Sequence, residues 1–256
     1  MKYRAILSIV GILVFASVIF AYVPTEVTKS KNSVHVVIPE HAVQVADNVF
    51  SLGNSIDTDG NVVEGYLFIT NKKENAHIQT SSCYAFISKG ARWKTTEQYI
   101  IDSNLDSALT ESSLEAWDSQ VSFDVVGTRN VNGIIDGADS SGPDGKNEVL
   151  FNNLGATSTV AYTIIWGVLS GPLNQRKITE WDTVFNSGYS WSLTGEAGKM
   201  DYMNVAVHEF GHSIGMAHPS DSCTDESMYR FVDYGETKKR SLNNGDIVGI
   251  KKLYTG

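Results

Sequence analysis

The chain has 256 residues, enough for one or two domains, and its 42% hydrophobic content excludes a disordered protein. The formal net charge is −9, and the densest basic run, Lys238-Lys239-Arg240, is only three residues long. Because phosphate backbones bind cationic surfaces, nucleic acid is not expected as a partner. Residues 91–256 hold 13 basic and 22 acidic side chains, whereas residues 1–90 hold 7 of each, which indicates two segments of different character.

Residues 1–23 are typical of an export segment. Lys2 and Arg4 precede an apolar run over residues 5–23, which is long enough to cross a bilayer. A cleaved signal peptide and a retained membrane anchor both fit, because a bulky isoleucine stands where signal cleavage prefers a small residue. Either interpretation carries residues 24–256 across a membrane. The protein is therefore expected to be secreted and extracellular, or anchored to the membrane by an uncleaved N-terminal segment.

Residues 24–90 are predicted to form a β-rich N-terminal segment, which could serve as a propeptide. A polar linker over residues 24–33 leads into runs expected as strands at 34–38, 43–49, 62–70 and 83–88. Residues 57–61, with the sequence Asp-Thr-Asp-Gly-Asn, are typical of a hairpin turn. A calcium loop is the alternative. An EF-hand needs glycine sixth and glutamate twelfth, whereas here glycine is fourth and Glu64 eighth, which favours the turn.

The remainder of the chain, residues 91–256, mixes strands and helices. Strands are expected at 93–102, 121–126, 148–152 and 160–166, and a long loop rich in Gly and Asp at 127–146. Helices are expected at 107–117, at 203–217 with Asp201 as its cap, and at 244–254. Short strands of this kind followed by two helices indicate an α+β fold.

The eleven residues from His208 to His218 read His-Glu-Phe-Gly-His-Ser-Ile-Gly-Met-Ala-His. On a helix, residues four apart share a face, so His208 and His212 can hold one zinc ion at about 2.0–2.1 Å. Gly215 is expected to end the helix in a left-handed conformation, so that the returning chain supplies His218 as third ligand. Glu209 is expected to be the catalytic base that acts on a zinc-activated water, and it is not a ligand.

Here the sequence resembles the metzincin zinc peptidases, and most closely the matrixins (the matrix metalloproteinase type). Besides the zinc motif, the resemblance is carried by residues spread over 91–256, namely Arg92-Trp93, Val184-Phe185-Asn186, Trp191, Ser227-Met228-Tyr229 and the terminal run 245–254. It implies a matrixin-like peptidase domain with a twisted mixed sheet, an active-site helix and a C-terminal helix. It also implies that Met228 forms a hydrophobic floor under the zinc.

Several positions depart from the matrixin pattern. Pro219 follows the third histidine where matrixins usually carry serine, and Arg230 stands where astacins and serralysins place a tyrosine. No histidine lies between Arg92 and Val207, so the second, structural zinc of many matrixins is not expected. Gly245 replaces the first member of the acidic pair that precedes the last helix in matrixins, which puts the usual latch for a mature N-terminus in doubt.

A structural calcium ion is a second metal that the resemblance brings into consideration. The loop from Asp136 to Glu148 offers hard oxygen ligands in the region where matrixins hold calcium. A solvated acidic loop without an ion is the alternative.

The two cysteines, Cys83 and Cys223, admit three interpretations. A disulfide between them is favoured by export and by the even count. A latency switch would place the Cys83 thiolate at the open zinc position, as in matrixin zymogens, although its flanks do not resemble that family's Pro-Arg-Cys-Gly motif. Two free thiols are the third interpretation.

These observations lead to a secreted or membrane-tethered zinc endopeptidase that hydrolyses peptide bonds of protein or peptide substrates. The strand at 160–166 is expected to form the upper rim of the cleft and to pair with an extended peptide. A catalytic serine–histidine–aspartate triad is not an alternative mechanism, because every histidine after His77 belongs to the zinc motif. A non-catalytic zinc-containing extracellular binding protein on the same scaffold is the alternative. A zinc enzyme that acts on another bond, such as a deacetylase, is a third hypothesis.

Overall fold

The computed structural model of the chain describes residues 38–72 and 82–255. The expected export segment, the linker and almost all of the strand at 34–38 lie outside these residues. Among the described helices, none has the length and apolar character needed to cross a bilayer.

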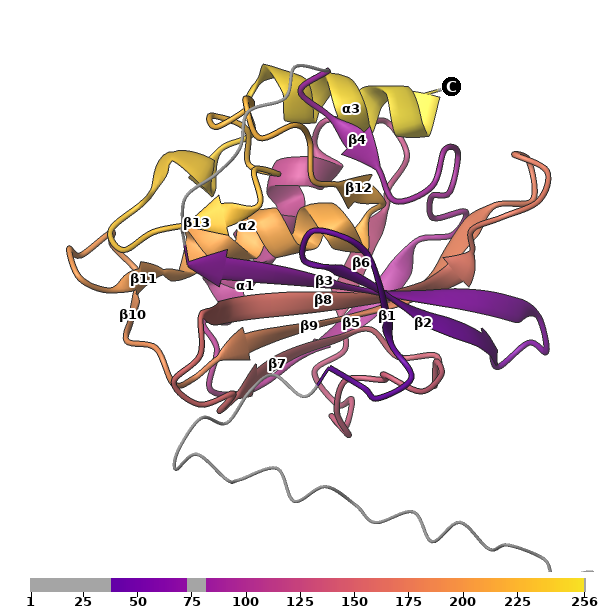
Figure 1. Ribbon diagram of the computed structural model, residues 1–256, viewed down its shortest axis with the longest axis horizontal. Coiled ribbons are helices and arrows are strands. Elements are labelled where there is room, and N and C mark those ends of the chain that lie inside the picture. The colour runs from indigo at the N-terminus through magenta and orange to yellow at the C-terminus, as the bar shows by residue number, and fades with distance from the viewer. Residues whose placement is uncertain (1–37, 73–81, 256) are drawn as a thin grey trace, which may run out of the picture. The chain divides into compact units, whose positions relative to one another are not determined.

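Within the part of the chain that the structure describes, a mixed sheet of nine strands forms the centre of the fold (Figure 1). Its strands pair in the order β1-β2-β3-β8-β9-β7-β5-β6, and β13 pairs with β3 beside this path. The strands are β1 (Val43–Ala46), β2 (Val49–Ile56), β3 (Val62–Lys72), β5 (Glu97–Ile101), β6 (Val126–Arg129), β7 (Glu148–Asn152), β8 (Thr159–Val168), β9 (Lys177–Asn186) and β13 (Phe231–Val232). β9, β7, β5 and β6 run parallel, whereas β8 is antiparallel to β9 and to β3.

The helices are α1 (Ser107–Asp118), α2 (Tyr202–Ser213) and α3 (Asn244–Thr255), with a 3-10 turn η1 (Lys238–Arg240). Two short pairs complete the fold, β10 (Trp191–Ser192) with β11 (Met200–Asp201), and β4 (Ala85–Phe86) with β12 (Met216–Ala217). In Figure 1, β4 and β12 lie between the sheet and α3. The main hydrophobic core joins the three helices to one face of the sheet, with fully buried Trp117, Phe185 and Phe210 among its members.

The expected α+β architecture is confirmed. The helices expected at 107–117 and 244–254, which correspond to α1 and α3, and the strand Glu148–Asn152 are confirmed as well. The hairpin turn at residues 57–61 is confirmed as well, because it connects the antiparallel strands β2 and β3. Within the turn, Asp57 Oδ1 accepts hydrogen bonds from the backbone N–H groups of Asp59 and Asn61. Sequence periodicity did not reveal β9 or most of β2.

Two expected elements are placed wrongly. The strand expected at 121–126 begins only at Val126, because the Asp118 carboxylate accepts the N–H groups of Val125 and Val126 at 2.7 and 3.2 Å and holds this segment against α1. The helix expected at 203–217 ends at Ser213. Gly215 has φ +107°, a left-handed conformation that ends the helix, and the residues after it pair with β4 instead.

The division predicted between residues 90 and 91 runs through a continuous structure. The described residues, 38–72 and 82–255, belong to one compact unit, and β3 from the N-terminal side pairs with β8 from the C-terminal side. The strand expected at 160–166 is present as the centre of β8, but it is not a free rim. Its two sides are occupied by β3 and β9, so in this structure β8 offers no free edge with which an extended substrate could pair.

Cys83 and Cys223 form a disulfide across 140 residues of sequence. The disulfide interpretation is therefore confirmed over the latency switch and the free thiols. It fastens the residues just before β4 to the loop between His218 and Met228.

Candidate metal centre and peptidase site

The three histidines of the motif converge on one point. His208 and His212 lie one turn apart on α2, and His218 returns after Gly215. The Nε2 atom of His218 lies 3.1 Å from that of His212 and 3.3 Å from that of His208. Four-coordinate zinc with Zn–N distances of about 2.0–2.1 Å separates its ligating nitrogens by about 3.3 Å, so the triad has the spacing of a tetrahedral zinc site.

The ring orientations of His208 and His212 direct the Nε2 lone pairs of these two residues toward the point where the three rings meet. His208 Nδ1 donates to the carbonyl of Ser227 at 2.6 Å, and His212 Nδ1 donates to the carbonyl of Met216 at 2.9 Å. Burial lowers the pKa of His212 to about 4, so the neutral ring predominates and its Nε2 carries no proton. His218 Nδ1 has no hydrogen-bond partner among the described residues, so this ring can carry its proton there and offer Nε2 to a metal as well. The donor set therefore fits a zinc ion.

Glu209 lies beside the triad on the same helix and is fully buried. Its Oε2 accepts a hydrogen bond of 2.7 Å from the hydroxyl of Thr163 on β8, while its Oε1 has no hydrogen-bond partner. Burial raises the pKa of Glu209 to about 7, and the hydroxyls of Thr163 and Thr70 act in the opposite direction. A carboxylate with one oxygen oriented and the other unsatisfied can accept a proton from a nearby water.

Met228 lies directly under α2 and is fully buried. Asp246, at the first turn of α3, holds the Met228 turn because its carboxylate accepts the N–H groups of Ser227 at 2.7 Å and Met228 at 3.2 Å. The carbonyl of Ser227 in turn fixes the ring of His208. Sequence reasoning identified Met228 but missed the role of Asp246, because its bonds to the turn cross 18 and 19 residues of sequence.

Strand β3 covers the site from the side of the sheet. The Phe68 ring stacks on the ring of His212, with centroids 4.5 Å apart and an interplanar angle of 22°, and meets the ring of His218 edge-on at 6.1 Å. Thr70, two residues further along the same face of the strand, is fully buried. Neither residue carries a local signal that sequence reasoning could have used.

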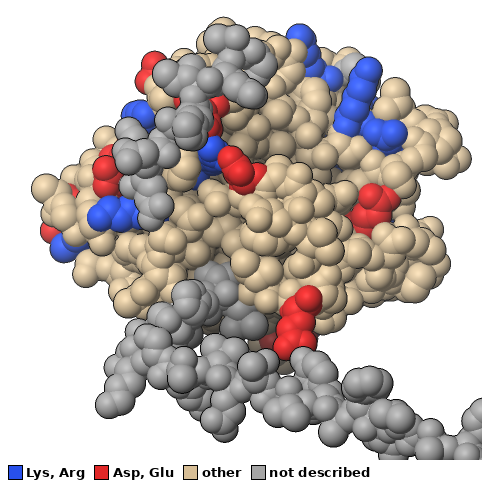
Figure 2. All heavy atoms as spheres, viewed as in Figure 1, with Lys and Arg blue, Asp and Glu red and all other residues tan. Residues whose placement is uncertain are grey.

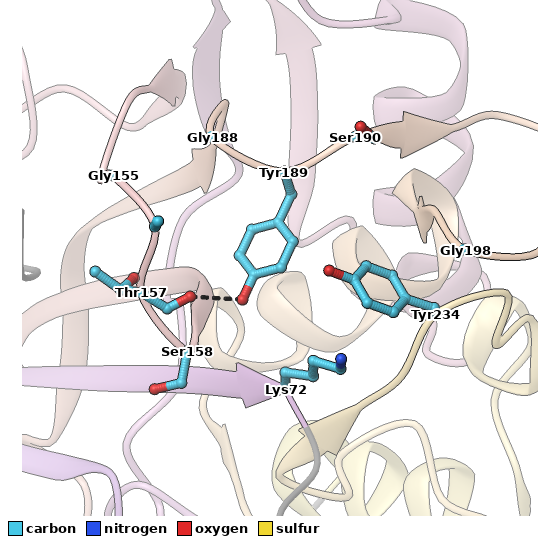
Figure 3. A pocket seen from close by; sticks show the side chains of 10 residues that line it. Lys72, Gly155, Thr157, Ser158, Gly188, Tyr189, Ser190, Gly198 and Tyr234 are labelled. Atoms are coloured by element: carbon cyan, nitrogen blue, oxygen red, sulfur yellow. Dashed lines mark hydrogen bonds between the residues drawn. The ribbon is translucent and has the colours of Figure 1, made fainter. Parts of the chain in front are cut away.

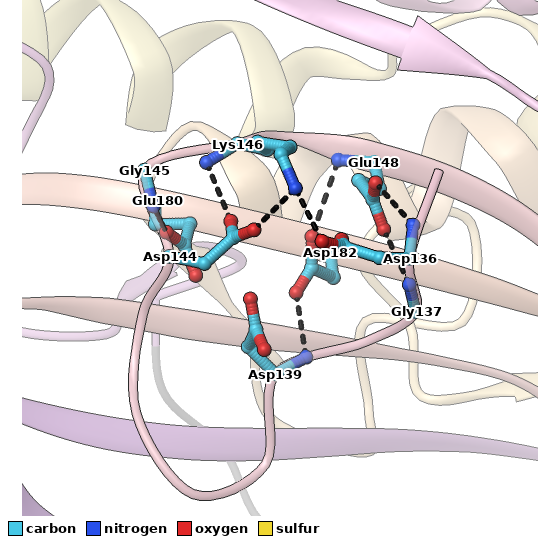
Figure 4. A network of polar contacts seen from close by, with 9 residues as sticks. All are labelled: Asp136, Gly137, Asp139, Asp144, Gly145, Lys146, Glu148, Glu180 and Asp182. Atoms are coloured by element: carbon cyan, nitrogen blue, oxygen red, sulfur yellow. Dashed lines mark hydrogen bonds and ion pairs between the residues drawn. The ribbon is translucent and has the colours of Figure 1, made fainter. Parts of the chain in front are cut away.

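The loop expected as a candidate calcium site meets two buried carboxylates from β9 (Figure 4). Oxygens of Asp139, Asp144 and Glu180 lie within 4.8 Å of one another. Glu180 is 1% exposed and its Oε1 has no hydrogen-bond partner. Burial raises the pKa of Glu180 to about 8, and burial followed by repulsion from Asp144 raises that of Asp139 to about 6. Lys146 forms ion pairs with Asp136 and Asp144 at the same cluster.

Charges on the described surface are dispersed. On the face shown in Figure 2, acidic and basic side chains lie scattered among uncharged ones. Of the three consecutive cations noted in the sequence, Lys239 is fully buried, and its Nζ donates to the carbonyls of Tyr229 and Phe231. Arg240 pairs with Asp201 at 2.5 Å. This basic run therefore supports the fold around α2.

An α+β domain with two histidines on its central helix, a third on the returning chain and a buried methionine turn beneath them has the architecture of a metzincin catalytic domain. The matrixin family model matches residues 166–255. Over 74 residues the chain is 39% identical to human matrix metalloproteinase-16, and over 73 residues it is 38% identical to human neutrophil collagenase and 36% identical to human matrilysin.

Each of these matches covers 28% of this chain and 12%, 15% and 26% of the respective relative, so the chain spans only a small part of the relatives' length. The family model covers the region that carries the zinc motif and the methionine turn. Residues 166–255 thus resemble the matrixin family, and this resemblance supports a matrixin-type metzincin catalytic domain in the chain.

Proposed function

We propose that residues 91–256 act as a zinc-dependent endopeptidase on protein or peptide substrates. The observation that carries this proposal is the convergence of three Nε2 atoms at 3.1–3.3 Å beside the buried carboxylate of Glu209. His208, His212 and His218 would hold the ion. When bound there, zinc supplies Lewis-acid polarisation of the scissile carbonyl and makes a water more acidic.

The protein side chains have distinct tasks in this reaction. Glu209 takes the proton of the attacking water and delivers it to the leaving amine. The hydroxyl of Thr163 orients Glu209 by its bond to Oε2, which leaves Oε1 to receive the proton. The carbonyls of Ser227 and Met216 fix the tautomers of two histidines, so that their Nε2 atoms remain free to bind metal. A purely zinc-holding protein has no use for Glu209, which favours the enzyme over the binding protein.

We also propose that the protein is exported, either secreted or held by residues 5–23. The Cys83–Cys223 disulfide supports this, because disulfides persist in oxidising compartments. A structural calcium ion at Asp139, Asp144 and Glu180 is a further proposal. It is supported by hard oxygen donors from two segments and by the unsatisfied Glu180 Oε1, which a cation would neutralise.

The test compares the zinc-loaded wild-type chain with Glu209→Gln on casein and on a panel of fluorogenic peptides. Glutamine leaves the three imidazoles untouched, so zinc content should be equal while the rate falls by about 10²–10⁴. His218→Ala should instead lower zinc content. Equal peptide hydrolysis by Glu209→Gln and wild type would show that the assigned base is wrong. Hydrolysis of acetylated substrates, but not of peptide bonds, would favour the deacetylase.

A further inference from the structure

Accepting the peptidase function proposed above, we propose that β3 occupies the groove in which an extended substrate would lie and thereby holds the enzyme latent. The chain's own strand, not a cysteine, would be the inhibitor. Both cysteines of the chain are consumed by the disulfide, so neither offers a thiolate to the metal.

The first argument is backbone pairing. β3 is antiparallel to β8 at eight consecutive positions, from Glu64 opposite Gly167 to Asn71 opposite Thr159. At its C-terminal end it is also parallel to β13, which lies just after Met228. A peptide that binds by adding a strand to β8 needs the same N–H and C=O groups. The peptide and β3 therefore exclude each other.

The second argument is the position of the β3 side chains. Phe68 stacks on His212 and is 3% exposed, while His208, His212 and Glu209 have no exposed surface. Thr70, two residues further along the same face of β3, is fully buried as well. A scissile peptide must reach both the metal and Glu209. With β3 in place, this space is filled by the chain itself.

The third argument is that the side chains on the opposite face of β3 pack closely with those of its neighbouring strands. Leu67 and Ile69 pack with Ile164 and Trp166 of β8 in a second apolar cluster, which Leu52 of β2 completes. A Cβ on Gly65 would lie 2.5 Å from the ring of Trp166, so only glycine fits at this position. The strand is thus held in one register.

The groove has surroundings that suit a peptide. The Lys239 side chain fixes the segment around β13 through the carbonyls of Tyr229 and Phe231. Where β3 ends, Lys72 lines a pocket of 590 Å³ together with Tyr189 and Tyr234 (Figure 3). A displaced β3 would leave an open track along β8 that leads to this pocket.

The experiment measures access to the site by binding, apart from catalysis. A fluorescent peptidyl hydroxamate is titrated into the zinc-loaded full chain, and fluorogenic peptide hydrolysis is measured in parallel. Phe68→Ala removes the ring from His212 and weakens β3. It should tighten hydroxamate binding and raise kcat/KM by at least about tenfold, because a larger fraction of the molecules has a site that β3 does not cover. Leu150→Ala is the matched control, since it removes a buried leucine side chain from β7, a strand that pairs with β5 and β9 and not with β3. It should change both values less than about twofold.

A second variant keeps the test decisive if Phe68→Ala does not fold. Leu67 and Ile164 are cross-strand partners, and such partners lie about 4.5–5.5 Å apart at Cα, within reach of a disulfide. Leu67→Cys combined with Ile164→Cys should abolish hydroxamate binding when oxidised and restore it when reduced. The wild type treated with the same reductant controls for the Cys83–Cys223 bond.

The outcomes separate this proposal from the peptidase function. Equal hydroxamate binding by wild type, Phe68→Ala and the oxidised double variant would overturn strand occupancy, whatever the hydrolysis rates. Tighter binding by Phe68→Ala without hydrolysis of any peptide would support occupancy and overturn the peptidase function. Tighter binding with hydrolysis that Glu209→Gln removes would support both.

Discussion

The sulfur of Met228 lies 2.1 Å from the position that a Cβ on Gly211 would take. Gly211 is the residue between Glu209 and His212 on α2 that faces the methionine turn, and the ring of Trp117 closes the same space at 2.7 Å. The glycine in the middle of the zinc motif is therefore a packing requirement. It allows α2, which carries His208 and His212, to pack closely against Met228.

Gly211→Ala should destabilise the protein. In an open helix this change is favourable by about 1 kcal/mol, whereas forcing a methyl group into a filled core costs about 1–3 kcal/mol. Denaturant unfolding should show the loss, and zinc should bind more weakly because the helix shifts. Ser112→Ala, at an exposed position of α1, is the control and should change the free energy of unfolding very little. A stabilised Gly211→Ala would refute the packing argument.

Thr163→Val should slow peptide hydrolysis without loss of zinc. Valine keeps the shape of threonine but removes the donor to Glu209 Oε2, and a bond to a charged group contributes about 1.5–3 kcal/mol, so the rate should fall by about ten- to a hundredfold. The change is measured in the Phe68→Ala background, and the pH profile should shift to higher pH as the pKa of Glu209 rises. Thr183→Val, which loses only its bond to Thr163, is the control. Equal rates would mean that Thr163 does not position the base.

The acidic cluster predicts a stability that falls with rising pH when calcium is removed. The folded-state pKa of Glu180 is raised from 4.5 to about 8, mainly by burial, and Asp139 and Asp144 lie against it. A raised carboxyl pKa means that the folded state binds the proton more tightly than the unfolded state does. The protonated carboxyl therefore contributes to the free energy of unfolding at low pH, and this contribution is lost as the pH rises from about 5 through about 8. In chelator, the melting temperature should drop over this window.

Calcium should remove that drop, because a cation neutralises the ionised cluster. Glu180→Gln should reduce the drop without calcium, because the raised pKa values of Asp139 and Asp182 remain. If the melting temperature of the chelated wild type were flat between pH 5 and 8, Glu180 would not be the buried acid described here.

Removal of the disulfide should destabilise the chain without activating it. Cys83→Ala together with Cys223→Ala releases a loop of 140 residues, which costs about 4–5 kcal/mol in the chain-entropy model. Denaturant unfolding measures the loss, and thiol titration of the unfolded, unreduced wild type should find no free thiol. A large rise in peptide hydrolysis on Cys83→Ala alone, with stability unchanged, would restore the cysteine switch.

The sequence by itself determined the histidine triad, because its geometry is local. Four residues make one turn of helix, a glycine ends it, and His218 returns within six residues of His212. The same locality explains why the strand Glu148–Asn152 and the turn at residues 57–61 were predictable. β9 was not predicted because it buries Glu180 and Asp182, and charged residues are expected at exposed positions when a sequence is analysed by its hydrophobic pattern.

Only the tertiary structure decided what lies against the triad. β3 meets β8 across about a hundred residues of sequence, with Leu67 opposite Ile164, and no periodicity within either strand specifies that partner. Strand pairing of this kind depends on complementary faces, such as Gly65 under Trp166, that exist only after folding. Helical spacing brings the ligands together through the chain's own backbone, whereas the Phe68 ring reaches His212 only through the sheet.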